Sequence, residues 1–287
     1  MFVDGNAIAE VLKQKIAKRV SAIGVSPVLG IVIVGNNPVT ESFVRIKKRV
    51  AAEIGVVVKE FHFSETINTE ELCKSVAALS SDPLVDGVVI QLPLPRDIVA
   101  QSVLNAVPLE KDIDMLSHEA SAEFRKGTAN ILPPVAGAIQ EILEHHRIGV
   151  AGKDVLILGH GRLVGAPAAL LMRHNHAHVT VIDKEVAHLA ELSHEADIII
   201  SGVGQPGILQ PEMLKHGVVL IDAGTSEDGG KIVGDANPRC AEVASLYTPV
   251  PGGVGPITVS MIFKNVSIVV EHRMRRATMG GSQSMLR

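Results

Sequence analysis

The sequence predicts an α/β protein with two domains. Short runs rich in valine and isoleucine alternate with segments of helical apolar spacing along most of the 287 residues. Runs of this kind are typical of parallel strands that helices cover on both faces. A glycine-rich turn follows one of these runs near residue 159. A chain of this length is long enough to bury two separate hydrophobic cores.

The first part of the chain alternates between helix and strand. Apolar residues three and four apart predict helices, and compact β-branched runs bounded by glycine, asparagine or proline predict strands. Residues 93–134 show no clear period, and we expect them to be less regular. The predicted helices are 6–20, 40–54, 70–80 and 135–146, and the predicted strands are 28–34, 56–63 and 87–91.

The second part repeats the pattern around the glycine-rich turn. A buried strand at 153–158 precedes the turn, and we expect a second domain to begin near this strand. A long helix is predicted over 257–274, after a loop rich in proline and glycine. Further strands are predicted at 179–183, 198–201, 218–221 and 231–233.

Composition narrows the classes of function. Apolar residues make up 46% of the chain, which excludes a disordered protein. The net charge is −4, no run of five basic residues occurs and aromatic residues make up only 2%, so we expect no nucleic-acid partner. Cys73 and Cys240 are too few for a disulfide framework and fit a reducing compartment.

We expect a cytoplasmic protein with neither a membrane partner nor a metal site. Residues 1–5 lack the basic and apolar regions of a signal peptide, and no uninterrupted apolar run reaches membrane-spanning length. The alternating His174, His176 and His178 would suit a metal only if the segment were extended with all three on one side. A solvated turn is the better interpretation of these histidines.

Residues 248–258 form the most informative segment of the chain. They read Thr-Pro-Val-Pro-Gly-Gly-Val-Gly-Pro-Ile-Thr and lead into the last predicted helix. Regular secondary structure does not tolerate prolines and glycines this close together, because proline lacks a backbone donor and glycine readily takes a positive φ. A shaped loop of this kind is typical of a ligand site. The alternative is a rigid linker between domains.

A second glycine-rich segment, Gly159-His-Gly-Arg-Leu-Val-Gly165, follows a predicted strand and opens a predicted helix. In this context glycines let a pyrophosphate approach the N–H groups at the positive end of a helix, although the spacing is one residue longer than the usual fingerprint. Asp183 ends the next strand, 24 residues after Gly159, where a carboxylate can accept hydrogen bonds from the ribose hydroxyls of NAD. The alternative for Asp183 is an N-cap of a helix that begins near Glu185.

Three further segments stand out. They are Pro-Val-Leu-Gly-Ile-Val-Ile-Val-Gly at 27–35, followed by Pro38 and Lys47; Asp-Gly-Val-Val-Ile-Gln-Leu-Pro-Leu-Pro at 86–95; and Glu-Lys-Asp-Ile-Asp at 110–114. Together with the proline-glycine loop and the glycine turn, they resemble the bifunctional methylenetetrahydrofolate dehydrogenase and cyclohydrolase family. The matches keep the family's order from near the start to about residue 270, which makes the resemblance specific.

The resemblance implies a fold and an assembly. It implies an N-terminal α/β catalytic domain that binds folate, a Rossmann-like dinucleotide-binding domain for NAD or NADP, and a C-terminal helix that returns to the first domain. The implied boundaries are 1–134 plus 257–287 for the catalytic domain and 135–256 for the nucleotide domain. The resemblance also implies a homodimer formed through the nucleotide domain, and one-carbon derivatives of tetrahydrofolate as ligands.

The implied reaction is the oxidation of 5,10-methylenetetrahydrofolate by hydride transfer to the nicotinamide. The resemblance implies that Lys47, Gln91 and Asp114 are the catalytic residues. Gln91 would position Lys47, and Asp114 would bind the pterin ring. The alternative is that Asp112 and Asp114 are loop-capping acids. The implied substrate-binding residues are Phe43, Pro251, Gly252 and Gly253. The implied cofactor-binding residues are Gly159, His160, Gly161, Arg162, Leu163, Val164, Gly165, Asp183, Gly202 and Thr258.

Phe43 departs from the family pattern, which has tyrosine four residues before the lysine. That spacing places Phe43 and Lys47 on one helical face. Desolvation would lower the pKa of Lys47 and let it act as a general base, but a phenyl ring exchanges no proton. We therefore predict a dehydrogenase whose cyclohydrolase activity is weakened or absent. Without the resemblance, Lys47 would be interpreted as a solvated charge beside Lys48 and Arg49.

Other functions remain as alternatives. A bifunctional enzyme that produces 10-formyltetrahydrofolate is one, if Lys47 alone suffices for hydrolysis. A non-catalytic paralogue that binds folate or nucleotide is another. The segments 115–118 and 133–136 also differ from the family's Gly-Phe-His-Pro and Pro-Cys-Thr-Pro, which keeps open a dehydrogenase for a different one-carbon carrier.

Two positions favour NAD over NADP. Asp183 stands where many family members that use NADP have histidine, and a carboxylate there repels a 2′-phosphate. His160 replaces an arginine of the family, which removes a candidate cation for that phosphate. Arg162 or Lys184 could still hold a 2′-phosphate, so NADP remains an alternative.

Overall fold

The computed structural model describes residues 1–183 and 188–284, apart from the side chains of Val39 and of residues 277–284. The chain forms two compact units. The large-sheet unit comprises Met1–Val11 and Pro133–Met261, and the small-sheet unit comprises Leu12–Leu132 and Ile262–Arg287. The predicted class, a two-domain α/β fold whose C-terminal helix returns to the first part of the chain, is therefore confirmed. The domain boundaries given above stay a prediction.

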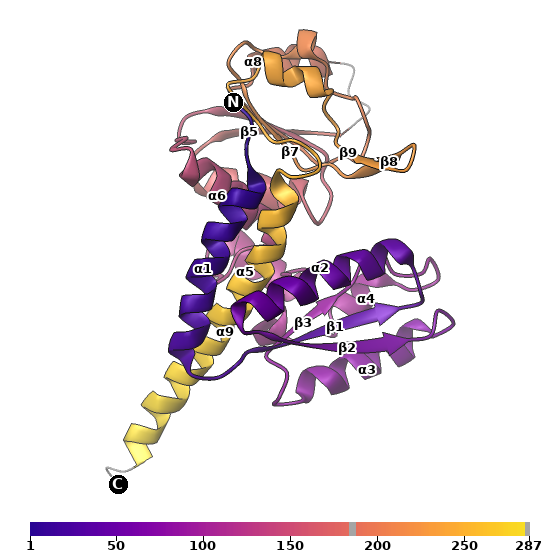
Figure 1. Ribbon diagram of the computed structural model, residues 1–287, viewed down its shortest axis with the longest axis vertical. Coiled ribbons are helices and arrows are strands. Elements are labelled where there is room, and N and C mark those ends of the chain that lie inside the picture. Colours follow the sequence, from indigo (N-terminus) through magenta and orange to yellow (C-terminus); the bar gives the residue numbers. More distant parts are fainter. Residues whose placement is uncertain (184–187, 285–287) are drawn as a thin grey trace. The chain divides into compact units, whose positions relative to one another are not determined.

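The small-sheet unit contains three parallel strands in the order β2-β1-β3 (Figure 1). β1 covers Val28–Val34, β2 covers Val57–Phe63 and β3 covers Gly87–Ile90. Every residue of β3 and all but the first of β1 are buried, as expected for strands that helices cover on both faces. In Figure 1, α2 (Pro38–Ile54) and α3 (Thr69–Ser81) lie on opposite sides of these strands.

The longer helices of this unit, in which the apolar spacing repeats over several turns, agree with the predicted ones. α3 begins after Asn68, whose side chain accepts from the Glu71 N–H and so satisfies a free donor of the first turn. The first residues of α1 and of α9 fall in the other unit. The helices are α1 (Gly5–Ile23), α2 (Pro38–Ile54), α3 (Thr69–Ser81), α4 (Ala100–Leu104), α5 (His118–Lys126) and α9 (Val254–Ser284), with a 3-10 turn η1 (Leu109–Lys111).

The segment 93–134 is more regular than we expected, because it contains α4, η1 and α5. α5 is bounded by two recognisable signals. The Ser117 hydroxyl accepts from the Ala120 N–H at 3.1 Å, and Gly127 ends the helix with φ of 74°. A helix of this length shows little periodicity, so its caps carry most of the local signal.

α9 meets the length and hydropathy of a membrane span over Val254–Arg276, by composition alone. Charged residues interrupt the stretch, and 56% of the most apolar window is buried inside the protein. Phe263 and Val266 have no exposed surface. This pattern is that of a core helix.

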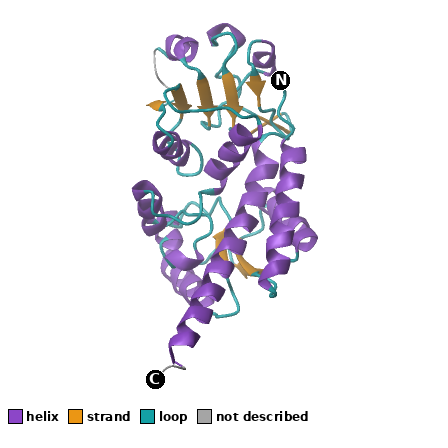
Figure 2. Ribbon diagram, turned by 90° about the vertical axis from the view of Figure 1, so that its left-hand side faces the viewer, coloured by secondary structure: helices purple, strands orange, loops and turns teal. Residues whose placement is uncertain are grey.

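The large-sheet unit contains five parallel strands in the order β10-β7-β6-β4-β5, with helices on both sides of them (Figure 2). Its core joins the sheet to α8 (Leu189–Glu195) and to the 3-10 turn η3 (Pro238–Glu242). The strands are β4 (Asp154–Leu158), β5 (His178–Ile182), β6 (Ile198–Ser201), β7 (Val219–Asp222) and β10 (Leu246–Tyr247). The helical elements are α6 (Pro134–His145), α7 (Gly165–His174), α8 (Leu189–Glu195), η2 (Pro211–Met213) and η3 (Pro238–Glu242).

The strand predicted at 231–233 forms, but it does not continue the parallel sheet. Lys231–Val233 is β9, which pairs antiparallel with β8 (Ser226–Asp228) in a separate hairpin. The turn Gly229-Gly230, with φ of 56° and 78°, explains this pairing, because two positive φ angles favour a tight hairpin.

The start of the chain extends the edge of the large sheet. Phe2 forms a parallel bridge with Tyr247, whose N–H donates to the Met1 carbonyl at 2.9 Å and whose carbonyl accepts from the Val3 N–H at 2.9 Å. The rings of Phe2 and Tyr247 meet edge to face, with centroids 5.7 Å apart. Tyr247 is buried, in agreement with a packing role.

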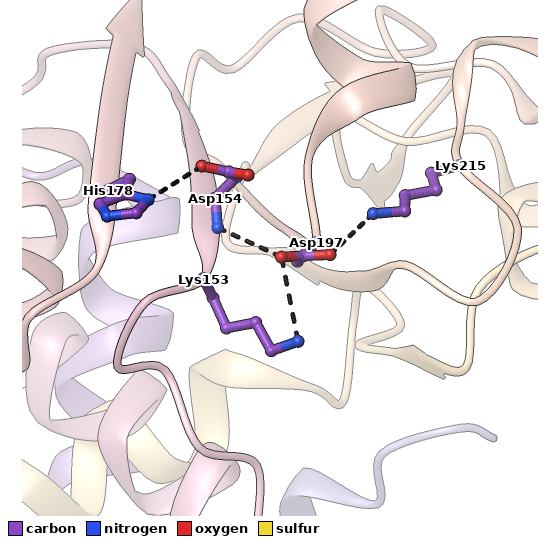
Figure 3. Close-up of polar contacts among 5 residues, drawn as sticks. All are labelled: Lys153, Asp154, His178, Asp197 and Lys215. Atoms are coloured by element: carbon purple, nitrogen blue, oxygen red, sulfur yellow. Dashed lines mark hydrogen bonds and ion pairs between the residues drawn. The ribbon is translucent and has the colours of Figure 1, made fainter.

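A charged cluster lies at the amino ends of β4, β5 and β6 (Figure 3). Asp197 accepts from Lys215 Nζ at 2.7 Å and from the Asp154 N–H at 3.3 Å, and Lys153 Nζ lies 4.0 Å away. His178 contacts the Asp154 carboxylate at 3.2 Å. Ligands of open parallel sheets bind at the opposite, carboxyl ends of the strands, so we assign this cluster to the structure of the strand starts.

Candidate active site and cofactor-binding loops

Lys47 and Gln91 meet at the carboxyl end of the small sheet. Lys47 lies on α2, and Gln91 follows β3. The Lys47 Nζ donates to Gln91 Oε1 at 2.7 Å, and both residues are more than nine-tenths buried. Gln91 is itself fixed, because its Nε2 donates to the Leu92 carbonyl at 2.9 Å and its N–H donates to the Val32 carbonyl at 2.9 Å. The lysine ammonium is therefore held in one place.

Asp114 lies beside the end of β3. Val88 and Asp112 form a parallel bridge, so two residues further on Asp114 reaches the same edge of the sheet as Gln91. Asp112 is buried and accepts from the Ser117 N–H at 2.8 Å, which makes it a loop-capping acid. Asp114 is half-buried and lies close enough to Lys47 for their charges to interact.

The surrounding protein lowers the pKa of Lys47 and raises the pKa of Asp114. Burial lowers the pKa of Lys47, and the charge of Asp114 opposes that shift. Burial raises the pKa of Asp114 to about 6, with Lys47 opposing the rise and Asp112 adding to it. Asp114 can therefore hold or release a proton near pH 6, and the lowered pKa of Lys47 makes this lysine a better proton donor than a solvated one.

Phe43 lies one helical turn before Lys47 on α2, as the spacing predicts. Its side chain is 38% exposed. Its phenyl ring adds apolar surface beside the lysine and supplies neither a donor nor an acceptor.

The backbone of the proline-glycine loop requires glycine at positions 252 and 253. A Cβ on Gly253 would lie 2.6 Å from the Pro249 carbonyl oxygen, and Gly252 has φ of 105°. The Gly252 carbonyl accepts from the Gly5 N–H at 3.0 Å, which ties the loop to the start of α1. Pro251 remains exposed. These glycines are therefore required by close approach and by backbone conformation.

The glycine turn of the large-sheet unit leads from β4 into α7. A Cβ on Gly165 would lie 1.9 Å from the Gly159 carbonyl oxygen, and Gly159 has φ of 91°. α7 begins at Gly165 without a side-chain cap; the Ala166 N–H donates to the Gly161 carbonyl at 3.1 Å and Pro167 has no N–H, so the attraction for an anion comes mainly from the positive end of the helix dipole. This geometry fits the pyrophosphate of a dinucleotide.

Asp183 and Gly202 flank this turn. The Gly159 N–H donates to the Ile182 carbonyl at 2.8 Å, which places Asp183 next to the turn at the end of β5. A Cβ on Gly202 would lie 2.4 Å from a methyl carbon of Val164, so the loop after β6 packs on the turn. Asp183 is exposed. The alternative N-cap role of Asp183, like Lys184, involves residues outside the described part of the chain.

The remaining predicted residues lie at the surface or within helices. His160, Gly161, Arg162 and Leu163 are exposed along the turn. The half-buried Thr258 lies on α9, where its hydroxyl donates to the Val254 carbonyl at 3.1 Å. Among the described residues, no group of three or more histidine, cysteine, aspartate or glutamate side chains could hold a metal ion.

Sequence reasoning missed two buried acids at the carboxyl end of the large sheet. Asp222 ends β7 and Asp235 follows β9, and neither has exposed surface. The Asp235 carboxylate accepts from the Ser201 hydroxyl at 2.6 Å. The dipeptide Gly234-Asp235 is a weak local sign of a special backbone position. The sequence around it does not reveal that the carboxylate binds Ser201, which lies 34 residues earlier.

Comparison with known proteins identifies the family. Residues 3–114 match the model of the tetrahydrofolate dehydrogenase/cyclohydrolase catalytic domain, and residues 133–274 match the model of the NAD(P)-binding domain. The chain belongs to the tetrahydrofolate dehydrogenase/cyclohydrolase family. The resemblance deduced from the sequence is confirmed, and so is the expectation of an enzyme of this family with an NAD(P)-binding domain.

Individual relatives agree over nearly the whole chain. The bifunctional protein FolD of Staphylococcus aureus is 34% identical over 280 residues, which cover 96% of this chain and 97% of that protein. The structure of bifunctional FolD from Campylobacter jejuni has a TM-score of 0.92 at 30% identity and covers 95% of this chain and 99% of its own. That of Trypanosoma brucei FolD, complexed with NADP and an inhibitor, has a TM-score of 0.90 at 31% identity, covering 96% and 98%.

Proposed function

We propose that this family member oxidises 5,10-methylenetetrahydrofolate to 5,10-methenyltetrahydrofolate with NAD(P) and hydrolyses the product weakly or not at all. Family membership supports the oxidation. The observation that carries the second part is Phe43, one turn before the buried Lys47. Hydrolysis needs an activated water and a proton relay, and a phenyl ring can take no part in that relay.

The proposed roles follow from the geometry of each unit. The glycine turn at the positive end of α7 fits the cofactor's pyrophosphate, and the bound cofactor would supply the hydride acceptor. Asp114 would accept hydrogen bonds from the pterin edge. Lys47, fixed by Gln91, would stabilise charge and hold a proton beside the one-carbon bridge. Pro251, Gly252 and Gly253 would present backbone to the substrate.

The first experiment follows both reactions in the purified protein. Reduction of NAD and of NADP is measured with 5,10-methylenetetrahydrofolate, and hydrolysis is measured with 5,10-methenyltetrahydrofolate. We expect oxidation with at least one cofactor and much slower hydrolysis. Absence of turnover with both cofactors, in protein shown to be folded, would reject the proposal.

Phe43→Tyr tests the role of the missing hydroxyl. We expect methenyl hydrolysis to rise by roughly tenfold to a hundredfold, because a phenol can relay a proton, while the oxidation rate changes little. Phe43→Leu is the matched control, since it alters the side chain without adding a donor. Unchanged hydrolysis in Phe43→Tyr would show that the missing hydroxyl does not limit the second reaction.

A bifunctional enzyme is the second candidate, and the environment of Lys47 favours it. Burial lowers the pKa of this lysine, which increases its capacity to act as a base near neutral pH. If Lys47 suffices, wild-type hydrolysis should match oxidation in rate, and Lys47→Met should abolish hydrolysis. A slow wild-type hydrolysis that persists in Lys47→Met would contradict this candidate.

We also propose that NAD is the preferred cofactor, because the exposed Asp183 carboxylate lies next to the glycine turn. A carboxylate accepts from ribose hydroxyls and repels a 2′-phosphate. Asp183→Ser should lower the ratio of kcat/KM for NAD to that for NADP by about tenfold or more. Asp228→Asn, an exposed acid on β8, should leave the ratio unchanged. A wild-type preference for NADP would overturn this assignment.

We propose further that the protein is a cytoplasmic homodimer without a nucleic-acid or membrane partner. The family resemblance supports the dimer, and the low basic charge supports the absence of a nucleic-acid partner. Sedimentation analysis of the purified protein across a tenfold concentration range should show one species of twice the chain mass. A monomer at all concentrations would refute the dimer.

A further inference from the structure

The two buried acids at the carboxyl end of the large sheet gather donors from several loops. The Asp235 carboxylate accepts from the Ser201 hydroxyl at 2.6 Å, the Val203 N–H at 2.9 Å and the Gln205 N–H at 2.8 Å. These donors belong to the end of β6 and the loop after it. Bonds from N–H groups to a carboxylate are about twice as strong as neutral ones. Asp235 therefore fixes the loop that includes Gly202.

Asp222 fixes the neighbouring segments in the same way. Its carboxylate accepts from the N–H groups of Gly224 at 3.0 Å, Asp235 at 3.1 Å and Ala236 at 2.8 Å. Its own N–H donates to the Thr248 hydroxyl at 2.7 Å, and that hydroxyl donates back to the Asp222 carbonyl at 3.1 Å. These last two bonds involve only the Asp222 backbone, so the start of the proline-glycine loop is tied to the end of β7 independently of the carboxylate.

Two glycines make room for the acids. A Cβ on Gly224 would lie 2.2 Å from the Asp235 carboxyl carbon, and a Cβ on Gly234 would lie 2.1 Å from Asp222 Oδ2. Real Cβ atoms do not approach other atoms so closely. The close approach of backbone to carboxylate is therefore part of the fold at both positions.

Burying a pair of acids to stabilise loops costs hydration free energy. Each buried ion loses several kcal/mol of hydration, and apolar residues of similar volume would often stabilise the fold as well. Burial raises the pKa of Asp222 to about 6, with the charge of Asp235 adding to the rise and backbone N–H groups opposing it. Both acids lie at the strand ends where ligands of open parallel sheets bind, and a carboxyl with a strongly shifted pKa, such as Asp222, is typical of functional sites.

We propose that Asp222 and Asp235 are positioning residues, whose carboxylates hold the loop after β6, the loop after β7 and the segment after β9 in the conformation that binds the cofactor. The inference rests on the proposed NAD(P) site. Neither acid needs to touch the cofactor. The loop after β6 also packs on the glycine turn through Gly202 and Val164, so its displacement would reach the pyrophosphate side as well.

Asp235→Asn is the main test. An amide has one oxygen, so its NH₂ group must face at least one of the Ser201, Val203 and Gln205 donors. We expect the Kd for NAD(P), measured directly by calorimetry, to rise at least tenfold. The Kd for a stable tetrahydrofolate analogue should stay within twofold, because Asp114, the predicted pterin-binding acid, lies in the small-sheet unit, and the donors that Asp235 holds are not part of the proline-glycine loop. Asp228→Asn, on the exposed hairpin, should change neither constant.

Amide hydrogen exchange gives a readout that does not depend on activity. The N–H groups of Val203 and Gln205 should exchange at least tenfold faster in Asp235→Asn, while those inside β4 keep their protection. Should that variant fail to fold, Ser201→Ala removes one donor only and should raise the cofactor Kd about threefold. Wild-type cofactor affinity in the folded variants, or an equal loss of folate affinity, would overturn the proposal.

These outcomes separate the inference from the proposed function. If the wild type binds NAD(P) but does not oxidise 5,10-methylenetetrahydrofolate, the function is wrong, while the binding and exchange measurements still judge the two acids. If the wild type binds neither cofactor, the positioning role is overturned together with the cofactor site.

Discussion

The Asp114 carboxyl, beside Lys47 and the end of β3, has its pKa raised to about 6, chiefly by burial. It is ionised above that pH, and only the ionised form can accept two N–H bonds from a pterin edge. We expect the Kd of a stable tetrahydrofolate analogue to rise about tenfold between pH 7.5 and pH 5, as the ionised fraction falls to roughly one tenth.

Asp114→Asn should bind this analogue weakly at every pH and lose most of the pH dependence. Glu119→Gln, an exposed acid on α5, should keep the wild-type profile. Calorimetric titrations at several pH values would measure both variants. A flat wild-type profile would contradict the proposed contact between the Asp114 carboxylate and the substrate.

At the scale of elements, the glycine turn brings the backbone of α7 into direct contact with the backbone at the end of β4. Gly165→Ala would bring a Cβ to 1.9 Å from the Gly159 carbonyl oxygen, so the turn must open. We expect the Kd for NAD(P) to rise more than tenfold and the free energy of unfolding to fall by about 2–4 kcal/mol.

Gly149→Ala is the matched control, because no heavy atom outside its own residue and its two chain neighbours lies within 4 Å of its Cβ position. Cofactor titration and denaturant unfolding of both variants give the comparison. Normal cofactor affinity in Gly165→Ala would show that the turn is not part of the binding site.

The elements that were easiest to predict from the sequence are those in which a clear apolar pattern continues over many residues. The buried strands of both sheets and the longer helices show their character in their own residues. By contrast, β10 is two residues long and exists through pairing with β7, and the place of β9 depends on its turn with β8. Asp222 and Asp235 were missed for the same reason, since their donors lie up to 34 residues away and only the fold brings them together.

At the scale of the whole chain, α9 joins distant segments of the small-sheet unit through one side chain. The buried Asn265 donates from Nδ2 to the Ile113 carbonyl and the Leu132 carbonyl, each at 2.8 Å and more than 130 residues away in sequence. Asn265→Ala would leave both carbonyls without this donor. We expect the free energy of unfolding to fall by about 2–3 kcal/mol.

Because Ile113 precedes Asp114, the same variant should also weaken binding of the tetrahydrofolate analogue. Met274→Ala, on the exposed side of α9, should alter the free energy of unfolding by less than about 0.5 kcal/mol. Denaturant unfolding gives both values. Equal stability of Asn265→Ala and the wild type would show that these bonds contribute little.

The pairing of residues 1–3 with Tyr247 has a consequence for synthesis on the ribosome. Residues 1–3 have no partner at this sheet edge until Tyr247, far later in the sequence, has been translated. During that interval these residues stay unpaired, and such late contacts slow folding. Completion of the large-sheet unit is thus postponed until β10 has been translated, and a variant in which residues 1–3 cannot pair would leave an open sheet edge prone to association.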